Sequence, residues 1–172
     1  MIQRIGPFLV VATLIAVSAP ASRAADWPQW GGRNERNFVS DERGLPSEFS
    51  RGSGTNLAEG ATFEPPKNLR WTAPLGSMTY STPAVSHGRI FIGSNDQRLQ
   101  DDRIPRTSGG LMLCLEEKSG RVLWQLPMPK LKTANKLFNY DDLSLGVCSS
   151  PVVDGDRVFV VSSRGEVLCL DV

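Results

Sequence analysis

The sequence is poor in the residues from which metal sites and nucleic-acid interfaces are built. Among 172 residues there is one histidine, and the three cysteines, Cys114, Cys148 and Cys169, are widely spaced. A zinc site usually needs about four Cys or His ligands at short paired spacings. Nineteen Lys and Arg residues face eighteen Asp and Glu residues, for a net charge of +1, so the chain lacks the basic excess that neutralises phosphates. We therefore expect no metal site and no nucleic-acid partner.

Long hydrophobic runs are also scarce, and the one that exists lies near the N-terminus. Residues 5–19 form an uncharged run of 15 residues, followed by small residues up to Ala24. A membrane-spanning helix needs about 20 apolar residues, so this length favours a signal peptide over a retained membrane anchor. No cysteine lies near the expected cleavage position to carry a lipid. We predict a signal peptide at 1–24, cleavage after Ala24, and an exported protein, periplasmic or extracellular, with no stable membrane anchor.

The remainder of the chain contains an internal repeat. Residues 81–94 align with residues 149–162 at a constant offset of 68, and six of the fourteen positions are identical. Residues 110–116 align with residues 165–171 at an offset of 55, and four of the seven positions are identical. Self-similarity of this kind is typical of folds built from repeated supersecondary units.

The repeated unit reads as short strands joined by tight turns. Its segments are rich in β-branched and aromatic residues and are separated by turn residues such as Gly88 and Gly120, which favours strands. In the first unit we expect strands at 82–86, 89–94, 111–116 and 122–126. Four antiparallel strands per unit make the blade of a β-propeller, so the predicted fold class is all-β.

The expected organisation places an irregular N-terminal arm before an incomplete propeller. A third correspondence sets residues 71–75 against residues 124–128 at an offset of 53, which predicts one more strand. Propellers have roughly four to eight blades, so we expect about two blades here and a chain that is the N-terminal portion of a larger protein. The predicted segments are the arm at 25–68 and the partial propeller at 69–172, divided into a strand at 69–75, a blade at 81–127, an insertion at 130–145 and a partial blade at 149–172.

One stretch of the first unit carries a family resemblance. Residues 114–124 read Cys-Leu-Glu-Glu-Lys-Ser-Gly-Arg-Val-Leu-Trp, which resembles the tryptophan-docking motif of the PQQ-like (pyrroloquinoline quinone) β-propeller repeat, Ala-x-Asp-x-x-Thr-Gly-Lys-x-x-Trp. Residues 26–30, Asp-Trp-Pro-Gln-Trp, are similar to the start of many exported bacterial members. The motif residues are Cys114, Glu116, Ser119, Gly120, Arg121 and Trp124, with Trp71 as the equivalent tryptophan before the first unit.

The resemblance implies a propeller of the quinoprotein alcohol dehydrogenase-like superfamily and a structural role for the motif. The flat indoles of Trp71 and Trp124 are expected to fill gaps between blades. Ser119 and Gly120, with the Glu116 carboxylate, are expected to shape the turn beneath. Cys114 and Cys169 occupy the same place in successive units, where we expect buried packing residues. Since the number of cysteines is odd, at least one stays free or pairs between chains, and the role of Cys148 is open.

The catalytic members of this family hold PQQ with a calcium ion, an Asp base and a pair of adjacent cysteines, and none of these parts can be placed in this sequence. His87 is expected to be a solvated turn residue and Asp96 part of a solvated loop. We therefore expect no catalytic, cofactor or metal residues, and a non-catalytic protein that acts in protein interaction or scaffolding, with protein partners or the remaining propeller blades. The alternative is a fragment of a PQQ-dependent quinoprotein dehydrogenase, an oxidoreductase whose cofactor site lies beyond Val172. A third possibility is an inert remnant that does not fold alone.

Overall fold

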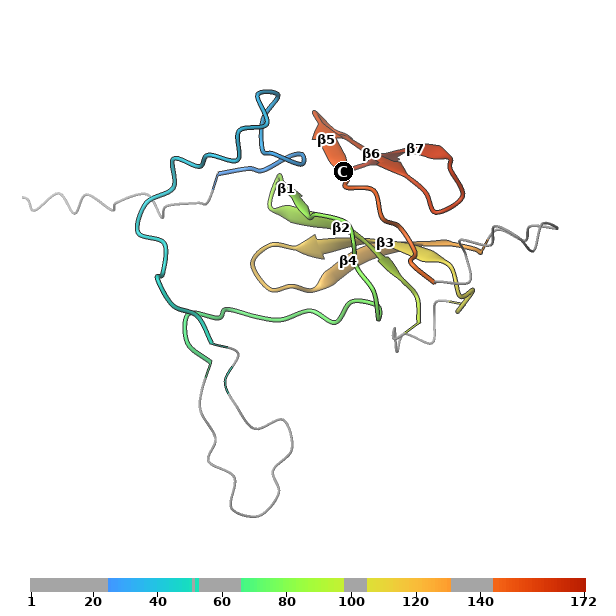
Figure 1. Cartoon of the computed structure of the whole chain (residues 1–172), viewed down its shortest axis with the longest axis horizontal. Helices are drawn as coiled ribbons and strands as arrows, with labels where there is room; N and C mark the ends of the chain where they lie inside the picture. Colours follow the sequence, from blue (N-terminus) through green and yellow to red (C-terminus); the bar gives the residue numbers. More distant parts are fainter. Residues whose placement is uncertain (1–24, 51, 53–65, 98–104, 131–143) are drawn as a thin grey trace, which may run out of the picture.

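The computed structural model of the chain describes residues 25–50, 52, 66–97, 105–130 and 144–172. These residues contain seven β-strands in two antiparallel sheets and no helix (Figure 1). The predicted all-β class, with incomplete propeller blades, is confirmed. The predicted signal peptide and most of the 130–145 insertion lie outside the described residues. Within the described part of the chain, no helix has the length and apolar character needed to cross a membrane.

The first sheet is a four-stranded meander. Its strands lie in the order of the sequence, and each pairs with its neighbours in the antiparallel direction. A two-residue turn of His87 and Gly88, with φ angles of 54° and 73°, joins the first two strands, because a tight hairpin whose twist matches its strands needs left-handed residues. The strands are β1 (Ala84–Ser86), β2 (Arg89–Asn95), β3 (Gly110–Glu116) and β4 (Val122–Met128), so the four strands expected of the first unit are all present.

The second sheet repeats the first three strands of this meander. It consists of β5 (Val152–Asp154), β6 (Arg157–Val161) and β7 (Val167–Asp171), in that order and antiparallel. The pairing of Phe159 with Cys169 reproduces the pairing of Phe91 with Cys114 in the first sheet. The two offsets found in the sequence therefore correspond to equivalent strands in the structure.

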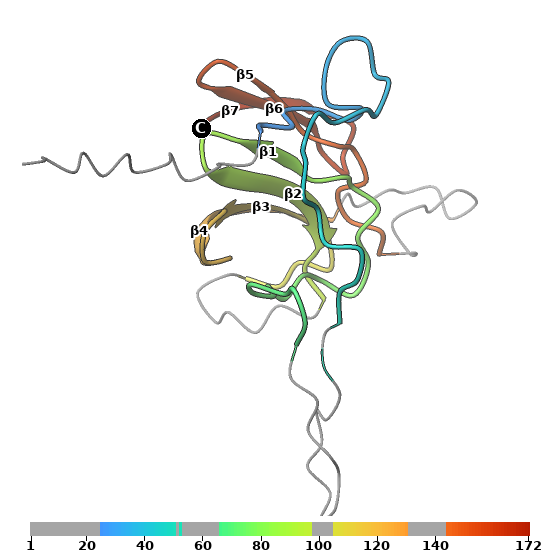
Figure 2. The same cartoon turned by 90° about the vertical axis from the view of Figure 1, so that its left-hand side faces the viewer.

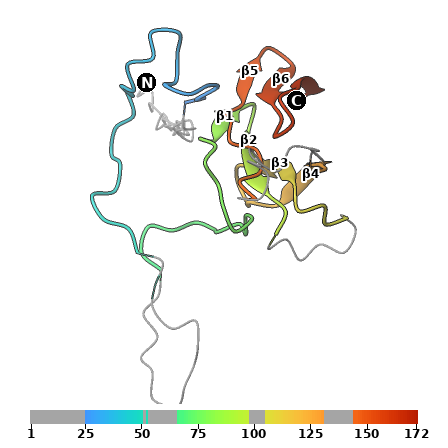
Figure 3. The same ribbon diagram turned by 45° about the vertical axis from the view of Figure 1, so that its right-hand side comes forward.

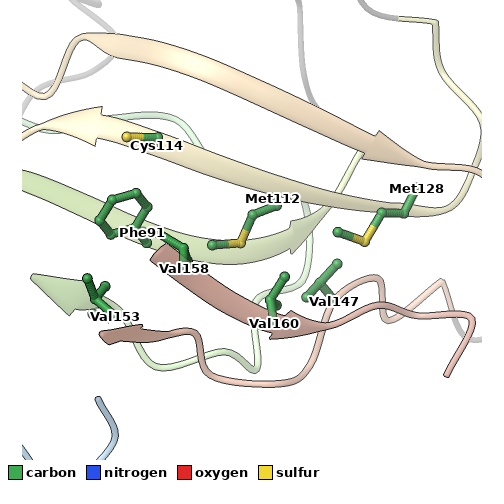
Figure 4. Packing of buried hydrophobic residues seen from close by; sticks show 9 residues of the cluster. Phe91, Met112, Cys114, Met128, Val147, Val153, Val158 and Val160 are labelled. Atoms are coloured by element: carbon green, nitrogen blue, oxygen red, sulfur yellow. The ribbon is translucent and has the colours of Figure 1, made fainter. Parts of the chain in front are cut away.

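The two sheets pack face to face (Figures 2 and 4). Phe91 and Met112 project from β2 and β3 toward Val158 and Val160 of β6. All four are buried, with at most 3% of their surface exposed, and complete burial of such side chains stabilises by about 1.5–3 kcal/mol each. The fully or nearly buried members of this cluster are Ala84, Phe91, Met112, Cys114, Met128, Val147, Val153, Val158 and Val160.

The opposite face of the first sheet is covered by residues that the sequence predicts to be a strand. Residues 69–75 form no strand and run as an irregular segment, whose Ala73 and Leu75 pack on Leu113 and neighbouring apolar side chains of β2 and β3. The segment forms no strand because it is held by side-chain contacts and not by a ladder of backbone hydrogen bonds to a neighbouring strand. Pro74 has no N–H to donate, and the Gly76 N–H donates to Ser94 Oγ at 2.9 Å.

The N-terminal arm extends from the two sheets and returns to the first sheet through residues 66–80. Its first residues lie beside β1 and β5, as the views in Figures 1 and 3 agree. An isolated antiparallel bridge pairs Trp27 with Val85, and a second pairs Ser50 with Lys67. The described residues of the arm form no strand beyond these two isolated bridges, and the arm is attached to the sheets at its beginning.

Candidate functional site

The turn between β3 and β4 is the best-formed part of the sequence motif. Gly120 has a φ of 71°, a conformation that glycine adopts without steric cost. Its N–H donates to the Glu116 carbonyl at 2.8 Å, and the Glu116 N–H donates to the Arg121 carbonyl at 2.8 Å. The Ser119 hydroxyl donates to the Glu116 carboxylate and accepts from the Arg121 N–H at 3.2 Å. The polar groups of the motif are thus used to build the turn.

Trp71 lies directly on this turn. Its indole Nε1–H donates to the Glu117 carbonyl at 2.9 Å. A Cβ atom added to Gly120 would lie 2.4 Å from Trp71 Cε3, which is too close for any real contact. Only glycine at position 120 therefore allows the indole to sit on the turn and reach the Glu117 carbonyl.

The same turn changes the pKa of the Glu116 carboxylate. The hydrogen bond from Ser119, followed by the nearby charge of Arg121, lowers the pKa of Glu116 below its ordinary value. An ion pair joins Glu116 and Arg121 at 3.5 Å. Both side chains are exposed, so the ion pair itself contributes little stability, and the carboxylate acts mainly as an acceptor that orients Ser119.

Trp124 has a different environment from Trp71, although the sequence repeat equates them. It lies on β4 opposite Cys114 and packs against the intersheet cluster. Its ring centroid is 6.0 Å from that of Phe91, with the planes tilted by 46°. Trp124 is half-buried beside the second sheet, at the edge of the contact between the two sheets.

The cysteines divide by exposure. Cys114 is fully buried, and this burial raises the pKa of its thiol to about 11. Cys169, which the sequence predicts to be buried as well, is exposed, because nothing in the described residues covers the outer face of the second sheet. Cys148 is also exposed, and partial desolvation raises the pKa of its thiol. All three are free thiols.

The outer face of the second sheet is apolar and open. Phe159, Val161 and Val167 have 38%, 44% and 75% of their surface exposed, and Val152 has 37%. We call this set the outer apolar face: Val152, Phe159, Val161, Val167 and Cys169. The opposite face of the same sheet is buried against the first sheet, so the sheet is apolar on both sides. Sheets with two apolar faces are typical of structures in which both faces are covered.

A buried polar cluster lies at the end of β2, where the sequence predicts a solvated loop. Asp96 is 1% exposed and Asn95 is fully buried, so the expectation for Asp96 is wrong. The Asp96 carboxylate accepts from the Thr107 N–H and hydroxyl through Oδ2, and its Oδ1 has no hydrogen-bond partner among the described residues. Asn95 Nδ2 donates to the Ser144 carbonyl at 2.6 Å. Asp96 thus attaches the loop between β2 and β3 to the first sheet, and Asn95 attaches the segment that precedes β5. Neither role could be predicted, because the hydrogen-bond partners are distant in the sequence.

His87 occupies its hairpin turn with an exposed side chain, as expected. Its Nδ1 lies 3.0 Å from Ser86 Oγ, which donates to the Asp26 carboxylate at 3.0 Å. Sequence analysis missed Asp26 because it lies 61 residues away from His87. Across the described residues, no three His, Cys, Asp or Glu side chains gather in the way that would hold a metal ion.

Comparison with known proteins agrees with the repeat and the fold. Residues 100–172 match the family model described as outer membrane protein assembly factor BamB, a PQQ-like repeat family. The match covers β3, β4 and the whole second sheet. A search of the curated proteins gave no match. Over residues 100–172, the chain is therefore similar to the PQQ-like β-propeller repeat family.

Proposed function

We propose that this β-propeller repeat protein is exported, is not an enzyme, and acts by binding other polypeptides, as an interaction or scaffolding module. The observation that carries the proposal is the outer apolar face of the second sheet. An exposed contiguous apolar surface marks a protein-interaction site in a water-soluble protein.

The internal repeat indicates what this face accepts. Phe159 corresponds to Phe91 by the offset of 68, and Cys169 corresponds to Cys114 by the offset of 55. In the first sheet these residues have 0% exposure because the second sheet covers them. The equivalent face of the second sheet therefore fits another apolar sheet of the same kind, presented by a further blade or by a protein partner.

The docking motif supports the non-catalytic part of the proposal. Glu116, Ser119 and the backbone amides around Gly120 are engaged in bonds within the turn. The Glu117 carbonyl, which also belongs to the turn, accepts the indole N–H of Trp71. The motif is therefore built to fix backbone geometry and to seat a tryptophan.

Support for export comes from the N-terminal sequence, which has the uncharged run and the small residues of a signal peptide. The relation to a family described as an outer membrane protein assembly factor is in keeping with an exported protein. The role of that factor is a property of the named protein, and here it only supports the class of function proposed.

The interaction role is tested by self-association, since a second copy is the partner available in a pure sample. Sedimentation velocity is measured on the wild type, on Val167→Lys, and on Leu45→Lys as the matched control. Leu45 is 70% exposed and lies outside both sheets, so it accepts the same new charge without changing the outer apolar face. We expect concentration-dependent association in the wild type and the control, and at least a roughly tenfold weaker association in Val167→Lys, because a desolvated charge opposes burial. Equal behaviour of the three proteins contradicts the proposal.

The non-catalytic role is tested separately. The purified protein is incubated with PQQ, calcium, an alcohol and an artificial electron-accepting dye. We expect no dye reduction above a protein-free control. Dye reduction that depends on the protein and on PQQ would overturn the proposal and favour the quinoprotein dehydrogenase alternative.

A further inference from the structure

The first residues of the arm bridge the two sheets. The Trp27 N–H donates to the Val85 carbonyl at 2.7 Å, and the Val85 N–H donates to the Trp27 carbonyl at 2.9 Å. The next carbonyl, that of Pro28, accepts the Val153 N–H at 2.8 Å. Val85 belongs to β1 and Val153 to β5, so two consecutive residues of the arm bond to the first strand of each sheet. Figure 3 shows this end of the arm beside β1 and β5.

The Asp26 carboxylate fixes where this segment docks. Its Oδ2 accepts the Ser86 hydroxyl at 3.0 Å and the His87 N–H at 3.2 Å. Asp26 therefore caps the β1–β2 hairpin while the following residue pairs with β1. A hydrogen bond to a charged acceptor is stronger than a neutral one, so this contact sets the register of the arm.

The Trp27 indole is seated by the arm itself. A Cβ atom added to Gly32 would lie 2.8 Å from Trp27 Cη2 and Cζ2, and Gly32 has a φ of 80°. The Gly32 N–H donates to the Gln29 carbonyl at 2.9 Å, which closes a turn under the ring. The segment from Trp27 to Gly32 is therefore a compact unit that presents two backbone carbonyls to the sheets.

The repeat explains why the segment docks on the first hairpin and not on the second. At the offset of 68, Ser86 is replaced by Asp154 and His87 by Gly155. The carboxylate of Asp154 would repel that of Asp26, whereas the Ser86 hydroxyl donates to it. Pro28 has no N–H, so its contact with β5 uses only its carbonyl, and a proline at the edge of a sheet leaves no unsatisfied donor.

From these contacts we propose that the adjacent edges of β1 and β5 form a recognition site for an extended Asp-Trp-Pro segment, which the chain fills with its own residues 26–28. Filling the site locks the two sheets together and closes the open edge of β1, a position at which unpaired strands otherwise invite pairing with other chains. This site is separate from the outer apolar face and does not depend on what covers that face.

The test is amide hydrogen exchange of the full chain, read by NMR. Trp27→Ala removes the indole that lies over Gly32. Trp30→Ala is the matched control, because Trp30 is 48% exposed and packs edge-to-face against Phe38 within the arm. We expect Trp27→Ala to speed exchange of the Val85 and Val153 amides together by about tenfold or more, since these amides donate to the Trp27 and Pro28 carbonyls of the segment. We expect Trp30→Ala to leave both amides unchanged.

A peptide with the sequence of residues 25–32, added at millimolar concentration to Trp27→Ala, is expected to restore slow exchange at both amides. The same peptide with its first tryptophan replaced by alanine is expected to restore neither. The central β3 amide of Leu113 reports whether the fold survives. If Leu113 also exchanges fast, Gly32→Ala, which displaces the ring without removing it, takes the place of Trp27→Ala in both measurements. Unchanged protection of Val85 and Val153 in the variant, or failure of the peptide to restore it, overturns the proposal.

Discussion

Replacing Gly120 by alanine tests whether the docking turn is held by the indole of Trp71. Gly120 has a φ of 71°, and the new Cβ would lie 2.4 Å from Trp71 Cε3 and 2.7 Å from Cδ2. Because the nearest atoms belong to a rigid ring seated on the turn, the ring has to move away. The hydrogen bond from Nε1 to the Glu117 carbonyl, 2.9 Å long in the wild type, is then lost.

Three terms make up the expected loss of stability. An alanine in the left-handed conformation costs about 1–2 kcal/mol. Loss of the indole hydrogen bond adds about 0.5–1.5 kcal/mol, and loss of ring contacts adds to this. We expect Gly120→Ala to lower the free energy of unfolding by about 2–4 kcal/mol, within the range of damaging point substitutions.

The matched control is Gly165→Ala. Gly165 has a φ of 77°, and a Cβ there would meet nothing within 4 Å, so this variant carries only the backbone term of about 1–2 kcal/mol. The assay is urea unfolding followed by circular dichroism, in the wild type, the two single variants, Trp71→Ala, and the double variant with Gly120→Ala. In the absence of the indole, Gly120→Ala should cost no more than Gly165→Ala. The reasoning is refuted if Gly120→Ala and Gly165→Ala cost the same in the wild-type background, or if the double-mutant cycle shows no coupling.

Four further predictions concern thiols, a carboxylate and the N-terminus. At about pH 8, an alkylating reagent should modify Cys169 quickly and Cys114 only on unfolding, because burial keeps the Cys114 thiol protonated. Mass spectrometry of the labelled peptides measures both rates, and rapid modification of Cys114 in the folded protein would contradict the prediction. Burial raises the pKa of Cys114 from 9.0 to about 11. Between these pH values the folded state keeps the thiol proton and the unfolded state releases it, so the free energy of unfolding falls as pH rises. Urea unfolding at a series of pH values should show a steeper fall in the wild type than in Cys114→Ala. Ser119→Ala removes the main cause of the lowered pKa of Glu116, so an NMR titration should show that pKa rising toward its ordinary value, and no change would contradict the assigned hydrogen bond. Intact-mass measurement of the exported protein should give a chain that starts at Ala25, and a mass that includes the first 24 residues would contradict cleavage.

The strands and turns could be predicted because their causes are local. β-branched and aromatic runs, with glycine at the turns, are sufficient to place β1 to β4 to within about two residues of their observed bounds. The turn at Gly120 could be predicted for the same reason, since a positive φ is a property of the position itself.

Burial could not be predicted where it depends on distant elements. Cys114 and Cys169 are equivalent in the repeat, yet one is covered by the second sheet and the other is open. Asp96 is buried because Thr107 supplies two donors to its carboxylate, and no sequence pattern links these two residues. A residue's place in a repeat fixes which face it lies on, and the neighbouring sheet decides whether that face is covered.

The irregular segments were the hardest to predict, because they have no periodicity. Residues 69–75 share a Trp-x-x-Pro pattern with β4, but side chains of β2 hold the segment that follows them, and no strand pairs with it. The arm was expected to be irregular, and its contact with two sheets was missed because Val85 and Val153 lie far from Trp27 in the sequence. The one sequence feature that could have indicated this contact was the segment 26–32, which reads Asp-Trp-Pro-Gln-Trp-Gly-Gly.

The measurement that tests the proposed function most directly is thiol labelling of the protein in its native cells. Cys169 lies on the outer apolar face, whereas Cys148 is exposed elsewhere and reports whether the reagent reaches the protein. If the face is covered by another polypeptide, Cys148 should be labelled in cells and Cys169 should be protected, while both are labelled in the purified chain. Equal labelling of Cys169 in cells and in the purified chain would contradict a role for this face in binding.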